Sequence, residues 1–145
     1  MRRIAILLVP ILVGACLSTQ DSSLTLDPTD TNVAGSFSLA SINGSSLPII
    51  AAVNAAQETD LLSDTVSIQS DGTWTETSVF NITVFPGNTA STQVTVIGGT
   101  YTISSQQINF VQTTGGGSVA FAGSVKGSRL TLLYGGSQFL YNRVT

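Results

Sequence analysis

Repeated turn signals constrain the fold of this chain more than any other feature of its sequence. Glycine-containing pairs and triplets recur from residue 43 onward, at Asn43-Gly44, Asp71-Gly72, Pro86-Gly87, Gly115–Gly117, Lys126-Gly127 and Gly135-Gly136. The runs between them alternate apolar and polar residues, as expected for strands with one buried face. Short strands separated by tight turns predict antiparallel hairpins, not the strand–helix–strand units of a parallel sheet.

The last three runs of the chain agree on one inward face. If Gly135-Gly136 is a two-residue turn, Leu132 faces Phe139. If Lys126-Gly127 is another, Phe121 faces Leu132 on the same side of the sheet. A slip of one residue would turn every side chain to the other face, so this agreement supports the hairpins. The inward set is Val119, Phe121, Val125, Leu130, Leu132, Tyr134, Phe139 and Tyr141.

The strands are expected to close into a barrel. The chain has 145 residues, which suits one domain, and only 9% are charged, which disfavours long surface helices. Eight or nine consecutive antiparallel strands lose both exposed edges when the first pairs with the last. We therefore predict an all-β, antiparallel up-and-down β-barrel over residues 33–145, with an open sandwich as the alternative. Residues 45–63 lose the alternation and predict a short strand near 47–53, then a loop or helical turns.

The first 15 residues have the organisation of an export signal. Met1-Arg2-Arg3 is a positive start, residues 4–13 are apolar, and Val13-Gly14-Ala15 supplies the small residues that a signal peptidase requires. A transmembrane helix needs roughly 20 apolar residues, and this run is shorter. We predict that residues 1–15 are a signal peptide.

Val13-Gly14-Ala15-Cys16 resembles the lipobox of bacterial lipoproteins. The resemblance implies that Cys16 is acylated and becomes the mature N-terminus, whereas ordinary secretory cleavage is the alternative. Two acyl chains anchor a protein stably where one does not. Residues 16–32, polar after Leu17, are then a flexible tether to a membrane of the cell envelope. Because Leu17 is not Asp, the resemblance implies the outer membrane if the organism has one.

Several classes of function are excluded by what the chain lacks. It contains no His, and Cys16 is its single Cys, so acylation would leave no thiol for a disulfide, a metal site or a nucleophile. Without Arg2 and Arg3, three basic residues remain against eight carboxylates, a net charge of −5 that disfavours nucleic acid as a partner. We expect no enzyme activity and no cofactor or metal besides the covalent lipid on Cys16.

The domain resembles the lipocalin-like superfamily. Gly35-Ser36-Phe37 is similar to its Gly-x-Trp signature with Phe in place of Trp, and Arg143 matches the Arg that covers that ring. The segments GTYTISSQQINF and FLYNRV are also similar to small bacterial lipocalin-like domains found in lipoproteins. The resemblance implies a barrel with a small hydrophobic ligand, and an Arg143–Phe37 cation–π contact worth about 0.5 to 2 kcal/mol.

These features leave two possible functions. The barrel either binds a small ligand, or it is filled by its own side chains and serves as a non-catalytic structural or interaction module of the envelope. The sequence identifies no protein partner. Glu76 shares parity with Trp74 and would receive a cationic or hydroxyl group of a ligand, unless it lies at the rim or a bulge turns it outward. Nearly all aromatic residues have inward parity, which favours a filled barrel. A cavity of roughly 300 Å³ or more would favour binding. The candidate ligand-binding residues are Phe37, Trp74, Glu76, Phe110, Phe121, Tyr141 and Arg143.

Overall fold

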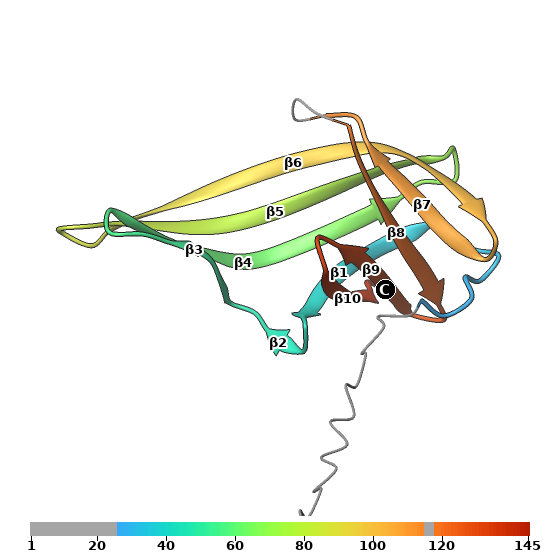
Figure 1. Ribbon diagram of the computed structural model, residues 1–145, viewed down its shortest axis with the longest axis horizontal. Coiled ribbons are helices and arrows are strands. Elements are labelled where there is room, and N and C mark those ends of the chain that lie inside the picture. Colours follow the sequence, from blue (N-terminus) through green and yellow to red (C-terminus); the bar gives the residue numbers. More distant parts are fainter. Residues whose placement is uncertain (1–25, 115–117) are drawn as a thin grey trace, which may run out of the picture.

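The computed structural model describes residues 26–114 and 118–145, and every regular element in these ranges is a β-strand. Figure 1 shows the strands wrapping into a barrel, with long strands that extend beyond it. The strands are β1 (Gly35–Ile42), β2 (Ser45–Ser46), β3 (Ile49–Val53), β4 (Gln57–Ile68), β5 (Thr73–Val84), β6 (Thr89–Ser104), β7 (Gln107–Gln112), β8 (Val119–Lys126), β9 (Arg129–Tyr134) and β10 (Ser137–Arg143).

The sheet closes on itself through β1. This strand pairs antiparallel with β10 on one side and with β4 on the other, and all remaining neighbours are consecutive strands. Eight strands, β1 and β4 to β10, therefore form the closed up-and-down barrel, and β2 and β3 are two additional strands. The predicted barrel is confirmed and the open sandwich is wrong, because pairing β1 with both neighbours removes the two free edges.

The barrel is closed only along part of the seam between β1 and β4. Their pairing runs from Gly35 opposite Ile68 to Ser38 opposite Thr65. Beyond that point β1 pairs with β2, and the first half of β4 pairs with β3. The two strands therefore separate, and the sheet β3-β4-β5-β6 projects past the short strands β7 to β10 (Figure 1).

Residues 45–63 differ in part from expectation. The predicted short strand is present as β3, Ile49–Val53. The predicted loop or helical turns are wrong from residue 57 onward, because β4 already begins at Gln57. Its first residues form ladders with β3 on one side and β5 on the other, and these backbone hydrogen bonds hold a polar sequence in extended form.

The hairpins at the end of the chain confirm the predicted inward face, with one change of register. Leu132 pairs with Phe139, as expected for a turn at Gly135-Gly136. The preceding turn is Gly127-Ser128, so Leu132 pairs with Gly123, not with Phe121. Gly127 adopts a positive φ of 60°, which suits a tight turn. The slip is two residues, and a slip of two keeps every side chain on its face.

One half of the barrel interior is a packed aromatic core. Phe37 and Phe110 are 0% exposed and Trp74 is 1% exposed. The Trp74 ring meets Phe110 and Phe121 edge-on, with centroids 5.7 and 5.4 Å apart. The backbones of β6 and β7 also approach closely here. A Cβ on Gly99 would collide with the carbonyl oxygen of Val111, so only glycine fits at this position. We call this half, which includes the β1–β4 seam, the closed half.

The segment before β1 is bonded to the barrel at the closed half. The amide of Thr29 donates to the carbonyl of Gln106, and the amide of Asp30 donates to that of Val125, each at 2.7 Å. Val33 is buried in the core. Backbone hydrogen bonds to the barrel therefore begin at Thr29, and an exposed ion pair joins Asp27 to Lys126, both ahead of the predicted domain start at residue 33. The predicted signal peptide and Cys16 lie outside the described residues.

No helix in residues 26–114 or 118–145 is long and apolar enough to cross a membrane.

Candidate functional site

A cavity of about 380 Å³ occupies the other half of the barrel, where β1 and β4 separate. Its wall is mainly apolar and aromatic, with a few polar side chains. We call this part the cavity half. The lining residues are Ile42, Ala51, Leu61, Asp64, Glu76, Ser78, Phe80, Ile97, Gln112, Phe121, Leu132, Tyr134, Phe139 and Tyr141.

Asp64 is the most deeply buried acidic residue of the cavity wall. Its side chain is 3% exposed. The hydroxyl of Ser78, on the neighbouring strand β5, donates a hydrogen bond of 2.6 Å to Asp64 Oδ2. Asp64 Oδ1 is buried and has no hydrogen-bond partner in the described part of the chain. A buried polar atom without a partner is rare, because it loses its hydration without compensation.

Glu76 lies beside this group. Burial raises its pKa from the ordinary 4.5 to about 8, and the negative charge of Asp64 contributes to the rise. Tyr141 lines the same space, and burial, together with the charges of Asp64 and Glu76, raises its pKa as well. At neutral pH the Glu76 carboxyl is therefore mostly protonated and can donate a hydrogen bond.

A β-bulge in β4 shapes the wall next to Asp64. The register between β4 and β5 shifts between Leu61 and Ser63, so Leu62 is an extra residue and is 42% exposed. Because of this extra residue, Leu61 and Asp64 both line the cavity although they are three positions apart. Without the bulge, Leu62 would have the inward parity that Asp64 and Val66 share.

The structure divides the candidate residues predicted from the sequence into three groups. Glu76, Phe121 and Tyr141 line the cavity. Phe37, Trp74 and Phe110 belong to the packed core instead. Arg143 lies at the closed half, where its guanidinium is 4.6 Å from the centre of the Phe37 ring and donates to the carbonyl of Ala34 at 2.6 Å.

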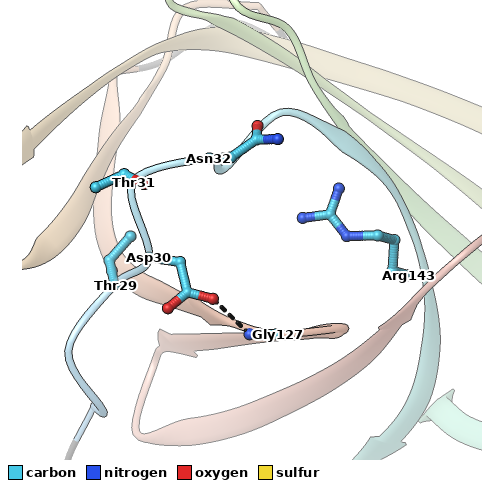
Figure 2. A pocket seen from close by; sticks show the side chains of 6 residues that line it. All are labelled: Thr29, Asp30, Thr31, Asn32, Gly127 and Arg143. Carbon is cyan, nitrogen blue, oxygen red and sulfur yellow. Dashed lines mark hydrogen bonds between the residues drawn. The ribbon is translucent and has the colours of Figure 1, made fainter.

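Arg143 also borders an open hollow of about 730 Å³ outside the closed half. Figure 2 shows Asp30 turned toward Gly127, whose amide donates to Asp30 Oδ2 at 2.6 Å, and Arg143 on another side of the hollow. The charged groups here already have partners, and the hollow is open to solvent. The inner cavity, with an unpartnered carboxylate oxygen, is the stronger candidate site.

Asp64 lies near the end of a predicted strand, but the predicted ligand-binding residues do not include it. It shares parity with Val66 and Ile68 on one strand, the same signal that singles out Glu76 next to Trp74. Its pairing with Ser78 across β4 and β5 places it on the same side of the sheet as Glu76. The register expected for the turn at Asp71-Gly72 pairs Ile68 with Trp74, and the structure confirms this pairing. The same register already places Asp64 on the inward side.

The polar groups of the wall favour binding over metal coordination. Within the described residues no group of three or more His, Cys, Asp or Glu is arranged to hold a metal ion. Two neighbouring carboxyl groups in a mainly apolar cavity can bind hydrogen-bond donors or a positive charge.

No protein-family model matches the chain, and no curated protein matches it. Among solved structures, the crystal structure of a mutant of the fluorescent protein UnaG is similar to this chain. The two share 13% sequence identity with a TM-score of 0.31, and the match covers 77% of this chain and 96% of that one.

Proposed function

We propose that this protein is a non-catalytic binding protein that holds a small, mainly apolar molecule inside its barrel. One observation carries the proposal: the cavity of about 380 Å³ in the cavity half. Sites for small molecules commonly span roughly 300 to 1,000 Å³ and combine apolar walls with a few polar groups. An eight-stranded barrel is wide enough to hold one small ligand.

Apolar contact supplies the binding energy in this proposal. Phe80, Ile97 and Phe139 line the space from three different strands. Each Å² of apolar surface removed from water contributes roughly 25 cal/mol. The cavity is already formed by the closed sheet, so little ordering of the protein opposes binding.

The binding domain is proposed to work at a membrane of the cell envelope, the outer membrane if the organism has one. The lipobox-like sequence ending at Cys16 supports this part of the proposal. Acyl chains on Cys16 would anchor the domain without a membrane span. Residues 29–32 border the hollow at the closed half and do not line the cavity, so this segment leaves the ligand site free.

Fluorescence of the neutral apolar probe N-phenyl-1-naphthylamine tests ligand binding. We expect saturable enhancement with the purified protein. Ile97→Trp, which fills the cavity, should weaken binding at least tenfold. Val96→Trp is the matched control, because Val96 lies on the same strand and is 61% exposed. Absence of saturable binding, together with no small molecule retained in native mass spectrometry, would contradict the proposal and favour the structural or interaction module.

The anchor has a separate test. Cys16→Ser should abolish incorporation of labelled palmitate and leave the chain either uncleaved at this site or soluble. A mature-sized Cys16→Ser chain retained in the membrane fraction would contradict the lipoprotein assignment. This outcome would not bear on the cavity.

A further inference from the structure

The charges that line the cavity are unbalanced. Asp64 and Glu76 are the two acidic residues in its wall, and none of the lining residues that the structure describes is Lys or Arg. The other titratable groups in the wall are the phenols of Tyr134 and Tyr141. Arg143, the basic residue of β10, is engaged with Phe37 and Ala34 in the closed half. The described residues that line the cavity therefore supply no positive charge to this space.

The unpartnered oxygen of Asp64 points to a group that is supplied from outside. Asp64 is more than nine-tenths buried and lines the cavity, but only Oδ2 has a partner, the Ser78 hydroxyl. Oδ1 has no partner within hydrogen-bond geometry among the described residues, although the Glu76 carboxyl and the Tyr141 hydroxyl lie close enough to interact with Asp64. A buried carboxylate is stable only when a donor or an opposite charge compensates its lost hydration. A bound molecule with a cationic N–H group would supply both.

The position of the acidic pair fits such a molecule. Asp64 and Glu76 come from adjacent strands, where Thr65 pairs with Thr77 and Asp64 with Ser78. The remaining lining includes aromatic and aliphatic side chains, Phe80 and Ile97 among them. One end of a bound ligand would therefore contact the carboxyl groups of Asp64 and Glu76, and the remainder of the ligand would contact apolar side chains. The volume of about 380 Å³ limits the ligand to a small molecule.

We infer that the cavity selects small apolar amines, with the ammonium group bound between Asp64 and Glu76 and the hydrocarbon body against Phe80 and Ile97. This inference rests on the proposed function, because it names the class of molecule that the binding barrel takes. Glu76 adapts to the ligand: its carboxyl is mostly protonated in the empty cavity at neutral pH and gives up its proton when the ammonium arrives. The complex then holds two carboxylates and one cation.

Isothermal titration calorimetry with three ligands tests the inference. The ligands share the same phenylbutyl group and differ only in the polar group at its end. They are 4-phenylbutylamine, 4-phenylbutanol and 4-phenylbutanoate, measured at pH 8.5 with the purified protein. We expect the amine to bind at least tenfold more tightly than the alcohol, and the carboxylate to bind most weakly. Equal or tighter binding of the alcohol or carboxylate would overturn the inference and leave the proposed function standing. Binding of none of the three would count against the proposed function itself.

Variants identify the groups responsible. Asp64→Asn and Glu76→Gln should each weaken amine binding at least tenfold and change alcohol binding by less than about threefold. Glu58→Gln is the matched control, since Glu58 lies on the same strand as Asp64 and does not line the cavity. Alcohol binding also reports that each variant is folded. Amine affinity that is unchanged in both Asp64→Asn and Glu76→Gln would overturn the assignment.

Proton release gives a readout that a merely structural carboxyl would not change. Calorimetry at pH 7 in buffers of different ionisation enthalpy should show close to one proton released per amine bound. The alcohol should release none, and Glu76→Gln should remove the release seen with the amine. Amine binding without proton release at pH 7 would overturn the role given to Glu76.

Discussion

The two halves of the barrel are built from the same strands but have opposite interiors. On β5, the inward residues Trp74, Glu76, Ser78 and Phe80 pass from the packed core to the cavity wall within seven positions. Trp74 is 1% exposed and in contact with other aromatic rings, whereas Glu76 and Ser78 face open space and a second carboxyl group. An inward-facing side chain can therefore belong either to the packed core or to the cavity wall. Which of the two it joins depends on how far along the strand it lies from the closed seam between β1 and β4.

The difference also separates stability from function. The closed half fills its volume and, apart from the buried hydroxyl of Thr29, pairs its buried polar side chains. Trp74, for example, donates its ring N–H to the carbonyl of Thr100 at 3.1 Å. The cavity half keeps an unpartnered carboxylate oxygen and unfilled volume. Both features cost stability, and buried groups of this kind are concentrated at functional sites.

The largest effect should come from removing a ring in the closed half. Trp74→Ala should lower the free energy of unfolding by about 3 to 5 kcal/mol, because the core around it is packed and would keep a cavity. Phe80→Ala, in the cavity half, should cost less than half as much, since Phe80 already borders empty space. Urea denaturation measures both. Equal losses would show that the two halves are packed alike.

The next effect is a pH dependence that belongs to the cavity half. Folding raises the pKa of Glu76 from 4.5 to about 8, so between these values the folded state binds more protons than the unfolded state. Stability should therefore fall as pH rises through this window, by up to about 1.4 kcal/mol per pH unit. Glu76→Gln should remove this part of the slope. Parallel profiles for the wild type and Glu76→Gln would contradict the burial of this carboxyl.

A smaller effect is expected for Arg143 in the closed half. Arg143→Ala removes the cation–π contact with Phe37 and the hydrogen bond to Ala34, and should lower the free energy of unfolding by about 1 to 3 kcal/mol. Arg129→Ala, at an exposed position of β9, is the control and should stay within about 0.5 kcal/mol. Affinity for the neutral probe in the cavity should not change. A large loss of probe binding would place Arg143 in the ligand site.

The smallest effect concerns the segment that crosses the closed half. Asp30→Ala removes the hydrogen bond to the Gly127 amide and should cost about 0.5 to 1.5 kcal/mol in thermal or urea unfolding. Asp27→Ala removes only an exposed ion pair with Lys126 and should cost less than Asp30→Ala. The reverse order would mean that the segment contributes little to the closed half.

Parity along the strands predicted most of the fold. The alternation and the turn signals gave the barrel, the inward face of β8 to β10, and the inward direction of Glu76. The two-residue slip at Gly127-Ser128 escaped this reasoning because a slip of two preserves parity, so the pattern cannot distinguish the registers. Lys126-Gly127, the predicted turn, and Gly127-Ser128, the observed one, both contain the glycine that a tight turn favours.

The cavity itself could not be predicted in this way. Whether Phe37, Trp74 and Phe110 line a space or fill it depends on where β1 and β4 separate, and this follows from long-range pairing with β2 and β3. Asp64 was accessible in principle, through its parity with Val66. The bulge at Leu62 was not, because one extra residue in a polar stretch leaves no distinct pattern.

The seam through β1 has a consequence for the order of folding. All other barrel strands pair with a neighbour along the chain, so their hairpins can form after closing short loops. The pairing of Phe37 with Arg143 instead joins residues at the two ends of the domain. Contacts of such long sequence separation carry the greatest loop-closure cost and are slow to form. We expect the hairpins to assemble first as an open meander, and the cavity to exist only after this last, slow zippering step.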